Sequence, residues 1–180
     1  HLDHIVGLTF LPSLLQEHPL RRVAVHGLPG VLAAIQRHLF APELFPLKPS
    51  YQSQPLAAET ALAGGGRLTH FPLVHQGGSI GFRLDWPGHS MAYVTDTTAD
   101  PAADYVERIR GVDLLLHECY YPDANAAWAA ETGHSSTSQV ARVAQAAAVG
   151  RLVLVHINPQ RTDDDPISLD TARAIFTRTE

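Results

Sequence analysis

The chain has a single cysteine and a single lysine among its 180 residues. The cysteine, Cys119, excludes an internal disulfide framework and is typical of proteins from a reducing compartment, so we expect a cytoplasmic location. With Lys48 as its one lysine and a formal net charge of -5, bulk attraction to nucleic acid is not favoured. No apolar run approaches the roughly 20 residues that a membrane-spanning helix needs, so no membrane partner is expected.

The composition is that of an ordinary globular protein. Hydrophobic residues make up 45% of the chain and charged residues 17%, which excludes disordered and fibrous classes. A chain of 180 residues can bury a sizeable core and has the length of one domain. We therefore predict a single domain over residues 1–180.

The first third of the chain predicts short elements and a loop. Apolar residues between 5 and 15 have a loosely helical spacing that Gly7 and Pro12 interrupt, which indicates a short or kinked helix. A strand is expected over 22–26 and a helix over 31–40. Residues 41–66 contain four prolines and end in three glycines, a composition that resists regular structure, so we predict a flexible flap there.

The rest of the chain predicts strands and helices in alternation. Three strands with short connections, over 67–75, 79–85 and 90–95, indicate an antiparallel meander. Ser136 and Gln139 have the spacing of a capping box before an apolar helical face, and Gly150 is expected to end that helix. A layered α/β protein follows from this pattern, but periodicity alone does not decide its topology. The other expected elements are a helix over 101–110, strands over 112–117 and 151–156, and a last helix around 172–176.

Residues of metal-binding type stand at the very start of the chain and at the ends of predicted strands. His1, Asp3 and His4 form a His-x-Asp-His pattern, and three more such residues each end a predicted strand. Ligands at strand ends are held by a rigid scaffold. Nitrogen and carboxylate donors without cysteine suit Zn²⁺, and Mn²⁺ or Fe²⁺ remain open. The three strand-end residues are His75, Asp96 and His156.

Taken in order, these motifs and Gly133-His134-Ser135 resemble the metallo-β-lactamase superfamily, in its tRNase Z and phosphodiesterase branch. The resemblance covers nearly the whole chain. It implies an αβ/βα sandwich of two mixed sheets with outer helices. The family's first histidine, in His-x-His-x-Asp-His, is expected before residue 1, so we expect an N-terminally incomplete domain whose opening strands are missing.

The resemblance also implies a ligand set for two zinc ions in the intact protein. The earlier histidine, His1 and His75 are expected on one metal, with Asp3, His4 and His156 on the other. Asp96 is expected to bridge both. Two metals about 3.5 to 4 Å apart lower the pKa of a shared water and stabilise charge on a phosphoryl oxygen. Asp3 is expected to orient the resulting hydroxide as a catalytic residue.

The family pattern further implies a catalytic pair. A histidine in a Gly-His-Ser segment is paired in this branch with a glutamate of a His-Glu motif, which would be His134 with Glu118. A carboxylate that accepts one ring N–H fixes the tautomer and raises basicity, so His134 could stabilise the developing phosphorane or protonate a leaving alkoxide. Taken singly, each residue has an ordinary explanation: Asp96 as a turn former, Glu118 as a solvated strand end, and His75 or His156 as structural histidines.

These implications favour a metal-dependent hydrolase, in first place a phosphodiesterase acting on a small phosphodiester. A lactonase or thioesterase and a tRNA 3′-processing endonuclease remain alternatives, as does a non-catalytic module that uses the same fold for interactions. Nucleic acid is not the favoured substrate because only a hairpin, with no extended arm, separates His75 from Asp96. Relatives of this kind are commonly dimers, so a homodimer is compatible.

Overall fold

The computed structural model describes residues 1–18 and 23–180. The chain divides into two compact units, His1–Ala57 and Ala58–Glu180. The prediction of one domain over 1–180 stays a prediction. Within the described ranges, no helix is both long and apolar enough to cross a membrane.

The first unit combines short helical segments with a two-stranded parallel sheet. Its helices begin as the interrupted spacing predicts, in short pieces that follow one another. The predicted strand over 22–26 is observed from Ala24, and Arg22 lies outside the described residues. Leu32, Ile35 and Phe40 are buried. The elements are α1 (Leu2–Ile5), η1 (Val6–Phe10), α2 (Leu11–Glu17), β1 (Ala24–Gly27), α3 (Pro29–Ala34), the π-helical η2 (Ile35–Leu39) and β2 (Gln52–Pro55).

Residues 41–66 contain more regular structure than their composition predicts. Gln52–Pro55 forms β2, which pairs in parallel with β1, and Glu59–Leu62 forms β3, which pairs with the next strand. The expectation of no regular structure is therefore wrong for these two segments. Edge strands tolerate proline, since one side of the strand makes no ladder bonds, and this is how Pro55 is accommodated at the end of β2.

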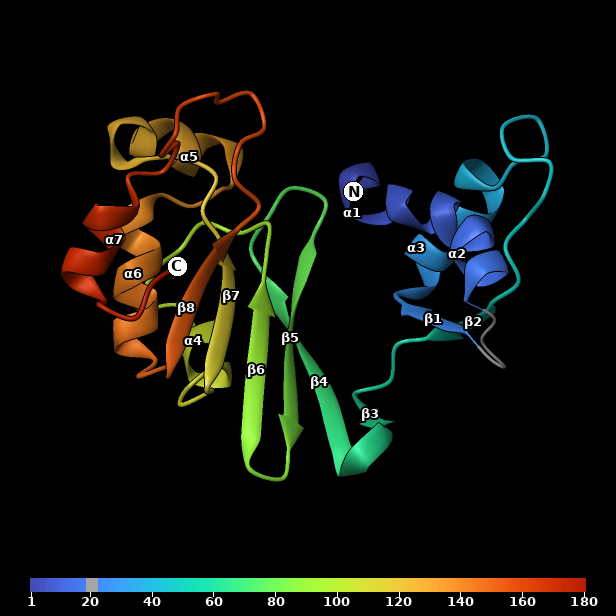
Figure 1. Ribbon diagram of the computed structural model, residues 1–180, viewed down its shortest axis with the longest axis horizontal. Helices are drawn as coiled ribbons and strands as arrows, with labels where there is room; N and C mark the ends of the chain where they lie inside the picture. Colours follow the sequence, from blue (N-terminus) through green and yellow to red (C-terminus); the bar gives the residue numbers. More distant parts are fainter. Residues whose placement is uncertain (19–22) are drawn as a thin grey trace. The chain divides into compact units, whose positions relative to one another are not determined.

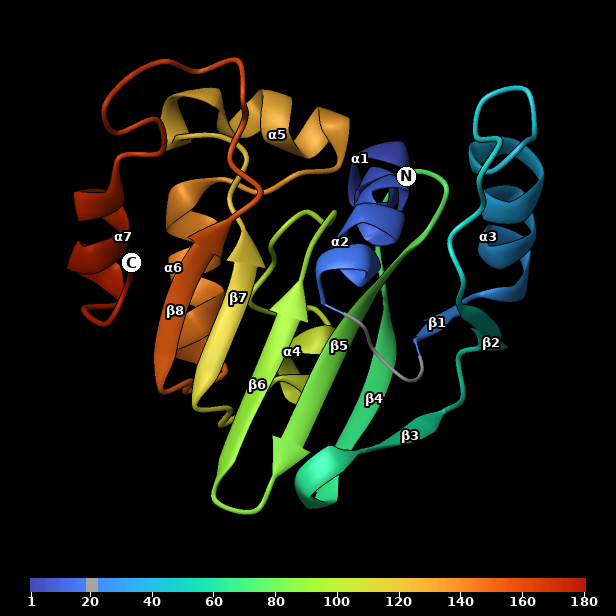
Figure 2. The ribbon, with the colours of Figure 1, turned by 45° about the vertical axis from the view of Figure 1, so that its right-hand side comes forward.

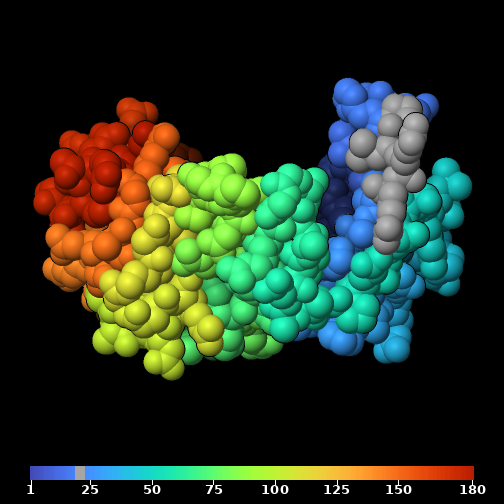
Figure 3. Space-filling view, turned by 90° about the horizontal axis from the view of Figure 1, so that it is seen from below, coloured from blue at the N-terminus to red at the C-terminus, as the bar shows by residue number. Residues whose placement is uncertain are grey.

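The second unit is built on a six-stranded mixed sheet in which every strand neighbours the next along the chain. Across this unit the colours change in the order of the residue numbers, both in the ribbon and in the space-filling view (Figures 1 and 3). Its strands are β3 (Glu59–Leu62), β4 (Gly66–Leu73), β5 (Ser79–Trp86), β6 (His89–Val94), β7 (Leu114–Glu118) and β8 (Arg151–Val155). Its helices are η3 (Ala63–Gly65), α4 (Tyr105–Arg108), η4 (Asp123–Asn125), α5 (Ala126–Thr132), α6 (Thr137–Ala146) and α7 (Leu169–Ile175).

Strand direction brings four strand ends to one edge of this sheet. The β4–β5 and β5–β6 pairs are antiparallel, as predicted for the meander, so β4 and β6 run the same way. The β6–β7 and β7–β8 pairs are parallel. The carboxyl ends of β4, β6, β7 and β8 therefore share one edge, which is where α/β sheets commonly place a site.

The core of the second unit lies between the sheet and the helices behind it. Figures 1 and 2 show α4 and α6 on the same face of the sheet. On α6, Val140, Val143 and Ala144 are buried at helical spacing and face the sheet's own buried Leu115 and Leu152 in one cluster. The predicted α/β class with two sheets and helices is confirmed, although the smaller sheet is a purely parallel pair.

Three local expectations differ from the structure. The helix expected over 101–110 is confined to α4, because residues 101–104 form turns. Ser136 is the N-cap of α6 but makes no side-chain capping bond, and Asp123 instead accepts the N–H of Ser138 at 2.9 Å. The helix also ends before Gly150, whose N–H donates a hydrogen bond to the Val112 carbonyl at 2.7 Å.

Candidate metal centre

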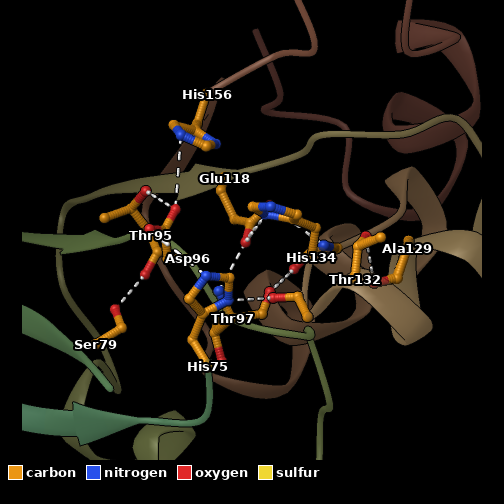
Figure 4. Close-up of polar contacts among 12 residues, drawn as sticks. His75, Ser79, Thr95, Asp96, Thr97, Glu118, Ala129, Thr132, His134 and His156 are labelled. Atoms are coloured by element: carbon orange, nitrogen blue, oxygen red, sulfur yellow. Dashed lines mark hydrogen bonds and ion pairs between the residues drawn. The ribbon is translucent and has the colours of Figure 1, made fainter. Parts of the chain in front are cut away.

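Four residues with ligand or acid–base chemistry stand at the shared edge of the second unit's sheet. Glu118 is the last residue of β7, and the other three lie one or two residues beyond β4, β6 and β8. Figure 4 shows their side chains turned toward one another. The three residues beyond the strands are His75, Asp96 and His156.

The Asp96 carboxylate faces two histidines with different oxygens. Its Oδ2 is 3.9 Å from Nε2 of His75, and its Oδ1 is 3.6 Å from Nε2 of His156. The Asp96 side chain is only 8% exposed. This is the arrangement that a bridging carboxylate requires, because each oxygen points to a separate donor.

These separations fit a divalent cation better than direct hydrogen bonds. A hydrogen bond would bring nitrogen and oxygen to about 2.7 to 3.2 Å. Two ligands that each lie about 2.1 Å from one zinc ion are roughly 3.4 Å apart in tetrahedral geometry. One ligand atom each from Asp96, His134 and His156 also lies within 4.8 Å of the others. The donors of this edge therefore suit a metal ion in both type and spacing.

The backbone at this edge is held in a conformation that ordinary residues avoid. Asp96 has a φ of 52° and His156 a φ of 54°, both in the left-handed region. For most residues with a side chain this costs about 1–2 kcal/mol, and aspartate and histidine are among those that adopt it more often. Such strain persists where surrounding structure over-determines it, and it concentrates at functional sites.

A backbone contact fixes the ring of His75. Its Nδ1 lies 2.9 Å from the carbonyl oxygen of Gly133. A carbonyl can only accept, so Nδ1 carries the hydrogen, and Nε2 presents its lone pair toward Asp96. Gly133 itself has a φ of +77°, and a Cβ there would lie 2.9 Å from His75 Nδ1. The absence of a side chain at residue 133 therefore makes this approach possible.

The predicted His134–Glu118 pair is formed. Nδ1 of His134 is 3.2 Å from each carboxylate oxygen of Glu118, and Figure 4 shows the contact. Glu118 is fully buried. The carboxylate also accepts the backbone N–H of Thr97 at 2.7 Å and of Ser135 at 3.2 Å, so both of its oxygens are hydrogen-bonded. The reading of Glu118 as a solvated strand end is wrong.

Sequence reasoning missed an aromatic side chain at this site. The ring of Tyr120 is stacked on His134, with centroids 4.5 Å apart and planes 17° apart. It also lies 5.4 Å from the ring of His156. Its position two residues after Glu118 is the only signal the sequence offers, and it does not distinguish Tyr120 from the neighbouring Tyr121.

Two further buried groups near Glu118 have shifted pKa values. Burial lowers the pKa of His117, whose Nε2 lies 3.1 Å from the Tyr105 hydroxyl and whose Nδ1 donates to the Glu118 carbonyl at 2.8 Å. Burial also raises the pKa of the Cys119 thiol to about 12. At neutral pH the imidazole and the thiol are therefore both uncharged.

The motif at the start of the chain forms a helical turn in the first unit. His1 is the N-cap of α1, and the backbone N–H of His4 contacts the His1 carbonyl at 3.2 Å. Oδ2 of Asp3 lies 3.3 Å from Nε2 of His4, so these two donors occupy one side of the turn. The roles predicted for His1, Asp3 and His4 as metal ligands stay predictions.

Comparison with known proteins supports one family. The family model for the beta-lactamase superfamily domain matches residues 1–157. Ribonuclease Z of Synechococcus sp. (strain CC9605) is 39% identical over 97 residues, which are 52% of this chain and 30% of that relative. The matched part thus spans less than a third of the relative.

Solved structures share the fold. The metallo-β-lactamase fold protein YhfI of Bacillus subtilis has a TM-score of 0.76 at 19% identity, covering 99% of this chain and 70% of that one. Human tRNase Z, short form, has a TM-score of 0.71 at 23% identity over 89% and 70%. Zn²⁺-bound PqqB of Methylobacterium extorquens has a TM-score of 0.65 at 22% identity over 100% and 64%. The chain therefore belongs to the beta-lactamase superfamily, and its architecture is the metallo-β-lactamase fold.

Proposed function

We propose that this protein is a metal-dependent hydrolase whose preferred substrate is a small phosphodiester. The observation that carries the proposal is the Asp96 carboxylate, which turns one oxygen to His75 and the other to His156. The catalytic pair of His134 and Glu118 lies beside it. Zinc is the favoured ion for these nitrogen and oxygen donors, and it is bound in a solved structure of the same fold.

The residues of the second unit would hold the ion through Nε2 of His75, the two oxygens of Asp96 and Nε2 of His156. A divalent ion at such donors supplies a Lewis acid that lowers the pKa of water and neutralises charge on a phosphoryl group. Asp96 is suited to bridge two ions because one of its oxygens faces His75 and the other faces His156. The proposed additional ligands are His1, Asp3 and His4.

His134 has the orientation of a general acid. Glu118 can only accept from Nδ1, so the opposite nitrogen, Nε2, faces away from the buried carboxylate. The Glu118 charge stabilises the protonated ring, and the ring can then give a proton to the alkoxide that leaves phosphorus. Because Glu118 is buried and held by two backbone N–H groups, the pair is rigid before substrate arrives.

The substrate preference rests on charge and on the segment between two site residues. Between His75 and Asp96 the chain forms only the β5–β6 hairpin, without an inserted arm. The net charge of -5 disfavours bulk attraction to the phosphates of a large nucleic acid. Precursor tRNA is the second candidate substrate, favoured by the 39% identity to a ribonuclease Z.

The test is turnover of bis-p-nitrophenyl phosphate, a lactone, a thioester and precursor tRNA by the zinc-loaded protein. We expect the phosphodiester to be hydrolysed fastest and activity to disappear with a chelator. Asp96→Ala should lose both metal and turnover, whereas His134→Ala should keep metal and lose about 10²–10⁴ in rate. His89→Ala is the control, since His89 begins β6 at the other end of the strand from Asp96.

The outcomes separate the candidates. Faster turnover of the lactone or thioester would move the assignment to those classes, and exclusive cleavage of precursor tRNA would favour the second candidate. A protein that binds no divalent ion and turns over none of the four compounds would contradict the hydrolase proposal and favour a non-catalytic interaction module.

A further inference from the structure

Two buried hydroxyl groups connect the segments that carry His75, Asp96 and His134. Thr97 and Ser135 are each 1% exposed. The Ser135 hydroxyl donates to the Thr97 carbonyl at 2.6 Å and accepts the N–H of Ala99 at 2.9 Å. The Thr97 hydroxyl donates to the Val74 carbonyl at 3.3 Å. Each bond reaches the backbone directly next to, or close to, a site residue.

The Glu118 carboxylate completes these connections. Oε1 accepts the N–H of Thr97 at 2.7 Å, and Oε2 accepts the N–H of Ser135 at 3.2 Å. Thr97 is thereby held at its N–H by Glu118, at its carbonyl by Ser135 and at its hydroxyl by the end of β4. Figure 4 shows Thr97 and Glu118 close to Asp96. We call Thr97, Glu118 and Ser135 the loop clamp.

These bonds restrain the backbone of Asp96, which directly precedes Thr97. Its φ of 52° lies in the left-handed region, which few residues with a side chain adopt, and the contacts of the neighbouring Thr97 help to hold this backbone in place. Asp96 is also the carboxylate on which the proposed metal site depends. A small rotation of its backbone would move both oxygens away from the imidazoles of His75 and His156.

We propose that the loop clamp positions Asp96 for metal binding, and that Ser135 and Thr97 are positioning residues of the metal centre although neither contacts a ligand side chain through its hydroxyl. Ser135 follows His134 in the sequence, so the same clamp fixes the general acid relative to the metal-binding carboxylate. This inference rests on the proposed function, because it requires that Asp96 binds a metal.

The experiment compares zinc affinity, measured by competition with a chromogenic chelator, among variants of the full chain. Ser135→Ala leaves the Thr97 carbonyl and the Ala99 N–H without their hydroxyl partner, and we expect its affinity to fall about 10- to 100-fold, as for outer partners of metal ligands. Thr97→Val is nearly isosteric and removes only the longer bond to Val74, so a smaller, several-fold loss is expected. If Ser135→Ala fails to fold, Thr97→Val still tests the loop clamp.

Thr137→Val is the matched control. Thr137 is fully buried, and its hydroxyl bonds the carbonyls of Ile167 and Tyr121 and contacts the Cys119 thiol, but none of these partners belongs to the loop clamp or is Asp96. Its removal should lower the unfolding temperature of the metal-free protein without changing zinc affinity. Wild-type affinity in folded Ser135→Ala or Thr97→Val, or an equal loss in Thr137→Val, would overturn the clamp. Failure of the wild-type protein to bind zinc would instead contradict the proposed function.

Discussion

Replacement of Gly133 by alanine is expected to weaken metal binding through His75. At a φ of +77° a side chain costs about 1–2 kcal/mol in backbone energy alone. In addition, the new Cβ would lie 2.9 Å from Nδ1 of His75, which is closer than a Cβ normally approaches another heavy atom. The imidazole must therefore shift, and its 2.9 Å contact with the Gly133 carbonyl is disturbed.

Gly111→Ala separates the two effects. Gly111 has a φ of +68°, and nothing lies within 4 Å of a Cβ placed there. Gly111→Ala should lose about 1–2 kcal/mol in the free energy of unfolding, measured by urea titration of the metal-free protein, and Gly133→Ala should lose at least as much. Only Gly133→Ala should also lose zinc affinity, by about 10- to 100-fold in chelator competition. Equal zinc affinity in the two variants would show that the Gly133 contact does not orient His75 for metal binding.

Three other changes test the acid pair and its surroundings. Glu118→Gln should lower kcat by about 10²–10⁴, because a neutral amide no longer stabilises protonated His134, and an unchanged kcat would contradict the pairing. Tyr120→Leu should slow turnover by about 2- to 10-fold through loss of the ring stack, whereas Tyr120→Phe should keep the wild-type rate; equal rates would exclude a role for the ring. Burial lowers the pKa of His117 in the folded state, so below about pH 6.5 the unfolded chain binds a proton that the folded chain does not. The free energy of unfolding should then fall by up to about 1.4 kcal/mol per pH unit as the pH decreases, and His117→Gln should show a shallower fall in pH-dependent urea titrations.

The strand ends of the second unit could be predicted from the sequence, because the residues that close them interrupt clear apolar runs. Those runs place His75, Asp96 and His156 after strands, and parallel strand direction brings them to one edge. The resemblance to a family supplied the pairing of His134 with Glu118, which periodicity does not contain. Their functional roles stay predictions.

Other features depend on tertiary contacts that leave no local signal. Neither the carbonyl of Gly133 nor the hydroxyl of Ser135 reveals its partner in the sequence, since each partner lies far along the chain. The strands β2 and β3 could not be predicted from the sequence, because the proline and glycine around them favour loops. Their conformation is decided by pairing with β1 and β4. The capping bond expected of Ser136 is absent because Asp123 occupies the helix start.

In the proposed site, Asp96 binds a divalent metal together with the histidines of the same sheet edge. Anomalous diffraction at the zinc absorption edge, from crystals of the zinc-loaded protein, tests it most directly. We expect a zinc peak about 2.0 to 2.2 Å from an Asp96 carboxylate oxygen and from Nε2 of His75 or His156. Zinc peaks found only elsewhere on the protein, or none at all, would contradict it.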